Sequence, residues 1–459
     1  MFIYLLYNYI IYCLFLKGRL RSMSNLNSFI GGIRIPKNAI ENVALGMPIE
    51  KLPHPDRVRI SFSKPAPPAV SVGDRVLLGS PLTAPDVKKA EHASVSGKVS
   101  GIEFDSDGNA LSVTIENDKL DEPAPSVVPF DKKLTDTSPE EIHSIIKKAG
   151  ICESLDGISV ARRIECALGG TRRLIVNCTE CEPFLASRRR LVLERPSDIL
   201  NGSKILLRAL EVNFADIAID NSDISAIRVL EDAIGENPLL RLRVTGDKYP
   251  QSDKTLIVNA VTGKEPPARE TTSQLGYVVF TAETCAAIFR AFAQGMPQTR
   301  RIVTVGGDCI AEQKVLEVPI GTPLSDIVSY CGSYTAKPAA IISGGLMKGT
   351  RLADDSCFVS KRDVGFLFLS DAYIKPVEAT DCIRCGKCVD DCPMHLLPNY
   401  LVRHASVLDL KKSLAMGLRS CIECGICAYN CPSGINHVYH IRRAKEAYNA
   451  EKAKEESDE

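Results

Sequence analysis

Two stretches near the end of the chain decide its interpretation: TDCIRCGKCVDDCP (residues 380–393) and SCIECGICAYNCPSG (residues 420–434). Each has the spacing C-x₂-C-x₂-C-x₃-C-P. The two-residue loops let three thiolates surround one face of an iron–sulfur cubane, while backbone N–H groups point at its sulfurs. Gly386 and Gly425 let the backbone pass close to the inorganic sulfur, because glycine has no Cβ. The doubled motif therefore predicts two [4Fe–4S] clusters.

The spacing also predicts which cysteines share a cluster. In bacterial two-cluster ferredoxins the fourth cysteine of each run binds the other cluster, and we expect the same cross-over here. Two zinc sites are the alternative, but zinc motifs normally combine separate C-x₂-C pairs, which fit a doubled four-cysteine run poorly. The predicted metal ligands are Cys382, Cys385, Cys388 and Cys431 for cluster 1, and Cys421, Cys424, Cys427 and Cys392 for cluster 2.

Length and composition limit the remaining possibilities. The chain has 459 residues, enough for about three domains, and its 45% hydrophobic and 24% charged residues are ordinary for a folded protein. Lys+Arg and Asp+Glu are both 56, so the net charge is zero, which argues against a nucleic-acid partner held by bulk charge. Seventeen cysteines in so long a chain exclude a small disulfide scaffold and favour a reducing compartment.

The first residues form a separate segment. Residues 1–16 are almost wholly apolar but include Asn8, and they are fewer than the ~20 that a spanning helix needs. They lack the basic start and cleavage site of a signal peptide. An ordinary soluble sequence begins at Met23. We therefore interpret residues 1–28 as a leader or misassigned start, with translation beginning at Met23, rather than as a membrane anchor.

The chain between these parts divides by its hydrophobic pattern. Residues 29–125 alternate apolar and polar residues between glycines, as strands and turns do, and resemble the barrel-sandwich hybrid of biotinyl and lipoyl carriers. Residues 126–300 alternate helices and strands, which indicates an α/β domain with a parallel sheet. Ligands of such sheets bind at the carboxyl ends of the strands, so the loop after Val176 is a candidate site. The remaining predicted parts are a β-rich piece at 301–370, a helical cluster domain at 371–449 and a charged tail at 450–459.

Several segments resemble one protein family, in the family's order. They include FIGGIRIP (29–36), NCTECEPFLASRRRLVLE (177–194), KYPQSDKTLI (248–257) and SGGLMKG (343–349). The chain resembles the C subunit of the Rnf electron-transport complex, RnfC, and its relatives, microcompartment cobalamin reductase and a proline-reductase-associated electron carrier. The resemblance implies a multidomain α/β plus β protein. Its expected parts are an N-terminal barrel-sandwich hybrid, a complex-I flavin-subunit-like α/β domain, an SLBB-like β-grasp piece and a C-terminal α-helical ferredoxin.

The flavin region departs from the family pattern. In the family, FMN and NADH sit on the α/β domain, where a glycine-rich loop cradles the flavin phosphate. Here residues 149–151 match the start of that loop, but Glu153 and Asp156 stand where glycines are expected, and carboxylates repel a phosphate. The segment 249–254 is also shorter than the family's YPQGGEK. This departure from the family pattern argues against NADH oxidation and against FMN binding by this chain. The cofactor-binding candidates that remain are Gly157, Asn177, Glu180, Glu182 and Lys254.

Four further cysteines lie close together in sequence: Cys152, Cys166, Cys178 and Cys181. Cys178 and Cys181 form a C-x-x-C pair, a spacing found in redox and metal sites. One interpretation is a third metal or dithiol site near the altered flavin loop. The other, which we favour, is a set of unrelated thiols that pack as small hydrophobic side chains.

Two functions fit these features. The first is an iron–sulfur subunit that relays electrons between a soluble donor or acceptor and a membrane Rnf-type complex, with a cytoplasmic position on the inner face of the membrane. The second is a soluble carrier for a dedicated reductase, without its own NADH site. A ligand-binding module leaves the eight cluster cysteines unexplained. A ferredoxin-like acidic partner is expected to meet basic residues near the clusters, unless these form only a solvated face: Arg384, Lys387, Arg403, Lys411 and Lys412.

Overall fold

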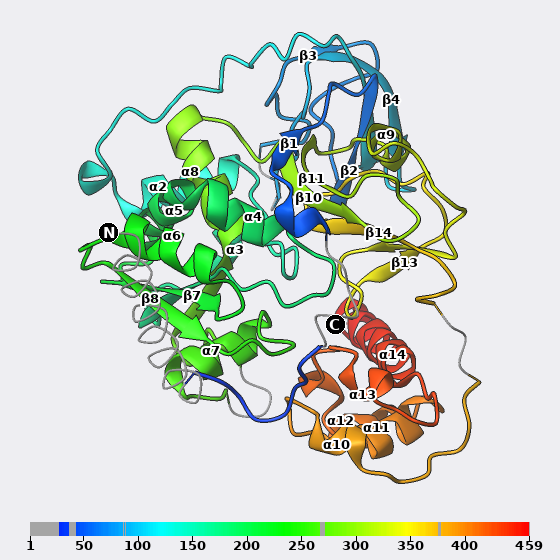
Figure 1. Ribbon diagram of the computed structural model, residues 1–459. Helices are drawn as coiled ribbons and strands as arrows, with labels where there is room; N and C mark the ends of the chain where they lie inside the picture. Colours follow the sequence, from blue (N-terminus) through cyan, green and yellow to red (C-terminus); the bar gives the residue numbers. More distant parts are fainter. Residues whose placement is uncertain are drawn as a thin grey trace, which may run out of the picture.

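The computed structural model describes residues 27–35, 43–85, 87, 89–266, 271–374 and 378–458. The chain forms a β domain, an α/β domain, a mixed β-sheet and a small helical domain that holds the cluster cysteines (Figure 1). The expected leader lies outside the described residues, apart from its last two positions. Within the described part, no helix combines the length and the apolar character needed to cross a bilayer.

The N-terminal β domain is a four-stranded antiparallel sheet in the order β2-β5-β4-β3. Its strands alternate buried and exposed residues, so Val58, Ile60, Val113 and Ile115 face one core. This confirms the β character predicted for the region. The strands are β2 (Arg57–Ala66), β3 (Arg75–Val76), β4 (Gly97–Phe104) and β5 (Ala110–Asn117).

The α/β domain contains a parallel four-stranded sheet in the order β8-β7-β6-β9. Leu174 and Val176 point into the larger core, whereas Ile175 packs against the helix on the opposite face. Both faces are therefore covered, as an all-parallel sheet requires. The strands are β6 (Arg173–Asn177), β7 (Ala215–Asp220), β8 (Leu240–Thr245) and β9 (Tyr277–Thr281).

The helices of this domain begin and end where capping predicts. Ser138 accepts a hydrogen bond from the backbone N–H of Glu141, and Gly150 follows the C-cap with a φ of 60°. The helix α7 covers one face of the sheet, and the others lie on the opposite face or beside it. They are α2 (Pro139–Lys148), α3 (Val160–Glu165), α4 (Ser187–Glu194), α5 (Pro196–Ala209), α6 (Ile224–Ile234), α7 (Lys254–Thr262) and α8 (Ala282–Gln294).

The segment expected to be SLBB-like forms a six-stranded mixed sheet in the order β1-β11-β10-β14-β12-β13. Its first strand comes from the N-terminal region: Ile49 pairs with Val315 in parallel. The boundary drawn at residue 29 from sequence therefore gives one strand to the wrong sheet, because a three-residue strand has too little pattern to show its partner. The elements are β1 (Ile49–Lys51), β10 (Arg300–Gly306), β11 (Lys314–Pro319), α9 (Leu324–Tyr330), β12 (Ala340–Ser343), β13 (Thr350–Leu352) and β14 (Gly365–Leu369).

The C-terminal domain is helical in its described part, as the spacer between the cysteine runs predicts. Leu401, Ala405, Leu418, Ile441 and Ala444 form its small core. The charged tail continues the last helix rather than leaving it. The helices are α10 (Lys387–Asp390), α11 (Pro398–Ala405), α12 (Leu410–Ala415), α13 (Ile426–Tyr429) and α14 (His437–Asp458).

A buried lysine joins three of these parts. The ammonium group of Lys361 lies 2.8 Å from Glu91 of the β domain, and both side chains are almost fully buried. The same ammonium donates to the carbonyl oxygens of Ala90 and Gly150, each at 2.9 Å. Since Gly150 begins the altered flavin loop, Lys361 fixes the position of that loop.

We predict that Lys361→Met lowers the stability of the chain strongly. Removing one partner of a buried ion pair costs about 3–5 kcal/mol, because the other charge stays buried, and this corresponds to roughly 10 °C in a domain of this size. Anaerobic differential scanning calorimetry measures the shift of the first unfolding transition. The exposed Lys98→Met is the control, and equal midpoints for the two variants would contradict the prediction.

Candidate electron-transfer site

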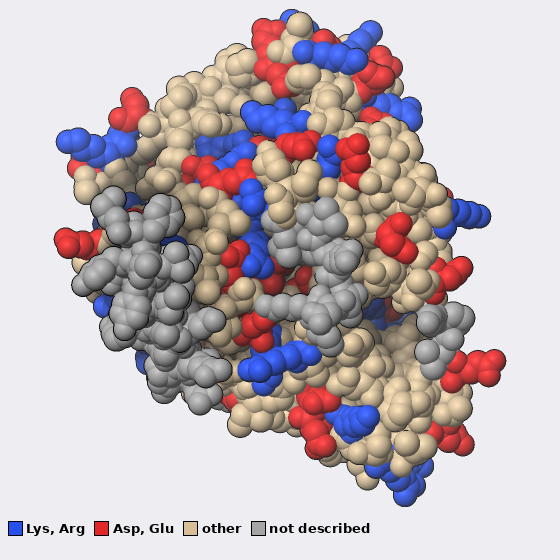
Figure 2. All heavy atoms as spheres, in the orientation of Figure 1, with Lys and Arg blue, Asp and Glu red and all other residues tan. Residues whose placement is uncertain are grey.

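A cavity of about 580 Å³ lies at the carboxyl ends of the parallel strands, where the fold predicts a ligand. Its wall comes from the α/β domain, from the mixed sheet and, through Ile422, from the cluster domain. Glu180, Glu182 and Lys254 line it, so the structure brings three of the five cofactor-binding candidates together. On the face of the molecule drawn in Figure 2, acidic and basic side chains lie next to one another in the upper middle.

The other two candidates have structural roles. Asn177 is fully buried, and its side chain donates to the Ser252 carbonyl and accepts from Thr179. It therefore holds two loops together rather than facing the cavity. Gly157 has a φ of 69° and lies against the side chain of Arg362. Its carbonyl accepts from Lys89 at 3.2 Å.

The altered flavin loop is held by its own carboxylates. Glu153 is fully buried and accepts hydrogen bonds from the backbone N–H and the hydroxyl of Thr281, at 3.1 and 2.7 Å. Because Thr281 is the N-cap of α8, this carboxylate lies at the positive end of that helix. The loop is thereby fixed to the end of β9.

The second carboxylate of the loop, Asp156, faces the cavity and is paired with two cations. Its oxygens lie 2.6 Å from the Arg163 guanidinium and 3.2 Å from the Lys254 ammonium. Burial raises the pKa of Asp156, but the two cations outweigh it and hold that pKa below its usual value. Asp156 is therefore ionised at neutral pH.

Six backbone N–H groups of this loop already have acceptors within the protein. In a phosphate-binding loop, such groups point at the ligand. Here they donate to the Gln298 side chain, to loop carbonyls and to the loop's own carboxylates. The donors are the N–H groups of Cys152, Glu153, Leu155, Gly157, Ile158 and Val160. These six groups are therefore engaged within the protein rather than open to a ligand.

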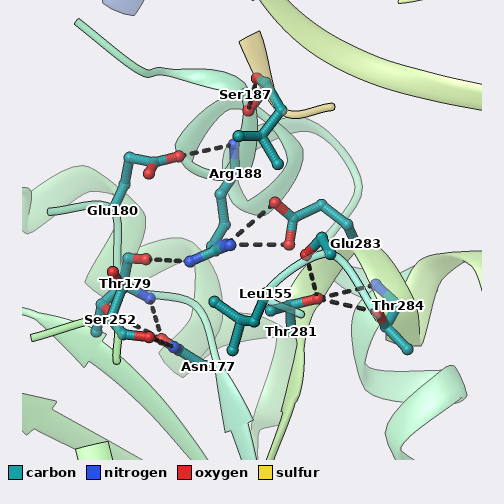
Figure 3. A network of polar contacts seen from close by, with 12 residues as sticks. Leu155, Asn177, Thr179, Glu180, Ser187, Arg188, Ser252, Thr281, Glu283 and Thr284 are labelled. Carbon is teal, nitrogen blue, oxygen red and sulfur yellow. Dashed lines mark hydrogen bonds and ion pairs between the residues drawn. The ribbon is translucent and has the colours of Figure 1, made fainter. Parts of the chain in front are cut away.

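A buried arginine supports the loop after β6. The Arg188 side chain donates to both oxygens of Glu283 and to the Thr179 carbonyl, and its backbone N–H donates to Glu180 (Figure 3). Burial raises the pKa of Glu180 to about 7, and Glu283 adds to this while Arg188 opposes it. Glu180 is thus a carboxyl at the cavity wall that exchanges a proton near neutral pH.

Tyr249 connects the cavity to the second cysteine run. Its hydroxyl donates at 2.6 Å to the carbonyl of Cys424, and it also lies 3.2 Å from Glu182. Glu182 in turn accepts from the Met347 N–H. Gly425 has a φ of 85°, and a Cβ there would lie 2.9 Å from the Met347 carbonyl oxygen. Only glycine permits this approach of the cysteine loop to the cavity wall.

The cysteines of predicted cluster 2 line one small cavity. Cys392 lies there beside Cys421, Cys424 and Cys427, although it comes from the other run. Backbone N–H groups point at two of these sulfurs, from Leu396 to Cys392 and from Glu423 to Cys421. Four thiols around an enclosed, mainly apolar space with N–H donors fit a [4Fe–4S] cluster. Ile422 lines both this cavity and the large one, so the two cavities share a wall residue.

The cysteines of predicted cluster 1 lie nearer the surface. Cys382 and Cys385 are exposed, and Cys388 is partly buried. The start of the first run is joined to the end of the second, because Ser433 donates to the Asp381 carbonyl and accepts from Thr380. These two hydrogen bonds hold the end of the second cysteine run, which includes Cys431, beside the first cysteine run. Among the described residues, no three His, Cys, Asp or Glu side chains have the geometry of a single-ion site.

The four additional cysteines do not meet at one point. Cys152 and Cys178 are buried, Cys166 is exposed at the end of α3, and Cys181 contacts Ser252 at the cavity. Burial raises the pKa of Cys178 and that of Cys181 to about 12, so both thiols are neutral at pH 7. Cys178 packs within the main apolar core of the α/β domain, which fits the packing interpretation for that thiol.

An N-terminal segment, residues 27–35, ties the cluster domain to the α/β domain; it is the dark-blue segment that runs below α7 to the cluster helices in Figure 1. Ile33 pairs with Tyr249, and the Gly32 N–H donates to the Asp391 carbonyl. Gly31 has a φ of 75°, and a Cβ there would lie 2.8 Å from the Cys392 carbonyl oxygen. Sequence reasoning missed this role, although the paired glycines were a signal of close approach.

We predict that Gly31→Ala weakens the hold on cluster 2, because the new methyl group forces the Cys392 loop away. Iron should be lost to a chelator several times faster, and the electron paramagnetic resonance (EPR) signal of cluster 2 should broaden more than that of cluster 1. Gly46→Ala is the control, since a Cβ there has nothing within 4 Å. Identical iron release from the two variants would contradict the role of the segment.

The fold, together with the cavity lined by cysteines of both runs, defines an iron–sulfur electron-transfer protein. Comparison with family models finds the RnfC barrel-sandwich hybrid domain at residues 27–120, the Nuo51 FMN-binding domain at 146–290 and a 4Fe–4S dicluster domain at 381–435. The expected architecture is thereby confirmed. The Nuo51 match includes the altered flavin loop, so the domain type is kept although the loop has changed.

Curated relatives identify the family. The chain is 32% identical to the C subunit of the Na⁺-translocating ferredoxin:NAD⁺ oxidoreductase complex of Acetobacterium woodii, over 81% of this chain and 86% of that protein. It is 32% identical to the C subunit of the proton-translocating complex of Clostridium ljungdahlii, over 82% and 84%. It is also 32% identical to the C subunit of the ion-translocating oxidoreductase complex of Rhodobacter capsulatus, over 81% and 74%. The chain belongs to the RnfC family.

Among solved structures, the chain is similar to a chain of an H₂-reduced NAD⁺-reducing [NiFe]-hydrogenase. The match has a TM-score of 0.49 and 18% identity, and covers 69% of this chain and 63% of that one.

Proposed function

We propose that the chain relays electrons through two [4Fe–4S] clusters as the C subunit of an Rnf-type complex. Cluster 1 is held by Cys382, Cys385, Cys388 and Cys431, and cluster 2 by Cys421, Cys424, Cys427 and Cys392. The observation that supports this most directly is the cavity shared by Cys392 and the second run. The clusters supply one-electron transfer, and the protein sets their potentials through burial and N–H donors.

The two clusters have different surroundings, which implies different partners. Cluster 1 lies beside exposed thiols, and Ile383 between them is 67% exposed. Val407 and Tyr429 of the same domain are also exposed, at 73% and 59%. An exposed large apolar residue between two exposed cluster thiols, such as Ile383, favours docking of another electron-transfer protein. We propose that this face meets a ferredoxin-like subunit of the complex.

The cysteines of cluster 2 line the inner cavity, and Ile422 lines both that cavity and the large one. We propose the wall at Ile422 as the second point of electron exchange. The curated relatives are subunits of ion-translocating complexes, which favours a position on the inner face of the cell membrane, in contact with other Rnf subunits. The family relationship favours this assembly over a separate carrier for a reductase.

The ligand cross-over is tested by four cysteine-to-serine variants. We predict that Cys431→Ser changes the same EPR signal as Cys382→Ser, and that Cys392→Ser changes the same signal as Cys421→Ser. Each variant is measured after anaerobic reduction with dithionite. Cys166→Ser, an exposed thiol outside both cavities, should leave both signals unchanged. Pairing of Cys392→Ser with Cys382→Ser would show that each run binds its own cluster.

A further inference from the structure

The altered flavin loop places a negative charge at the wall of the large cavity. The FMN-binding domain model covers residues 146–290, which include the loop and the start of α3. Within this region Asp156 lies at the cavity wall with its carboxylate between Arg163 and Lys254. The same carboxylate also accepts from the Ile158 N–H at 3.2 Å. A guanidinium, an ammonium and a backbone N–H are the donors typical of a phosphate site.

The cation at the centre of this arrangement needs an anion. The Arg163 side chain is only 9% exposed. One of its terminal nitrogens donates to the Val279 carbonyl, and the other contacts both oxygens of Asp156. A buried guanidinium without a counter-charge is costly. Whatever occupies this position must therefore be negative, and in this chain it is Asp156.

We propose that Asp156 is a built-in anion that takes the place of a flavin phosphate, and that Arg163 and Lys254 form a latent oxyanion site beneath it. This inference rests on the proposed electron relay, because it states how the relay works without a flavin of its own. The loop completes the replacement with Glu153, which occupies the N-terminus of α8. The loop therefore neutralises the Arg163 and Lys254 cations with Asp156 and the N-terminus of α8 with Glu153.

The test is titration of the cluster-loaded chain with inorganic phosphate, followed by thermal shift, for the wild type and Asp156→Ala. Asp156→Ala leaves Arg163 and Lys254 free, so half-saturation is expected at a phosphate concentration at least about tenfold lower than in the wild type. Adding Lys254→Met to Asp156→Ala should remove most of this gain. Asp107→Ala, in the exposed turn between β4 and β5, is the matched control and should behave as the wild type.

A second variant keeps the test decisive if Asp156→Ala does not fold. Asp156→Asn has the same shape without the charge, and it should gain phosphate binding in the same direction. FMN fluorescence is measured in parallel: the wild type should not quench added FMN. Equal phosphate binding by wild type and both Asp156 variants, or stoichiometric FMN binding by the wild type, would overturn the inference. The dithionite-reduced EPR signals are recorded in each sample, because their absence would instead refute the proposed relay.

Discussion

The structure depends on one close contact between the cavity wall and the second cysteine loop. The Tyr249 hydroxyl donates to the Cys424 carbonyl, while Gly425 passes against the Met347 carbonyl with no room for a Cβ. Because the contact is buried, a polar group left unpaired there is costly. The contact fixes the second cysteine run, with Ile422, beside the large cavity.

Several of the charged side chains around the cavity form ion pairs with one another. Asp156 pairs with Arg163 and Lys254, Lys348 pairs with Asp253, and Arg188 pairs with Glu283. A site prepared for an anionic ligand leaves its cations unpaired until the ligand arrives. The α/β domain has the parallel sheet, its covering helices and a cavity at the carboxyl ends of the strands, and the carboxylates of the altered loop are paired within the protein.

The sequence alone allowed correct predictions for features that depend on residues close together in the chain. The cysteine spacing predicted that Cys392 belongs with the second run, and the cavity places it there, although only the EPR comparison tests the ligands themselves. The Ser138 cap and the parallel sheet were also predictable from short-range patterns. Contacts between distant segments were not: nothing local shows that Ile49 joins β11 or that Lys361 reaches Gly150. Glu153 and Asp156 were noticed as misplaced carboxylates, but their partners Thr281 and Arg163 required the fold.

The central claim is that this RnfC-family chain passes electrons between clusters without oxidising NADH at a flavin of its own. It is tested most directly by counting iron, sulfide and flavin in the anaerobically purified chain and then titrating with NADH. The account predicts about eight irons and eight sulfides, no flavin, and clusters that are reduced by dithionite but not by NADH. One FMN per chain, with clusters reduced by NADH, would contradict it.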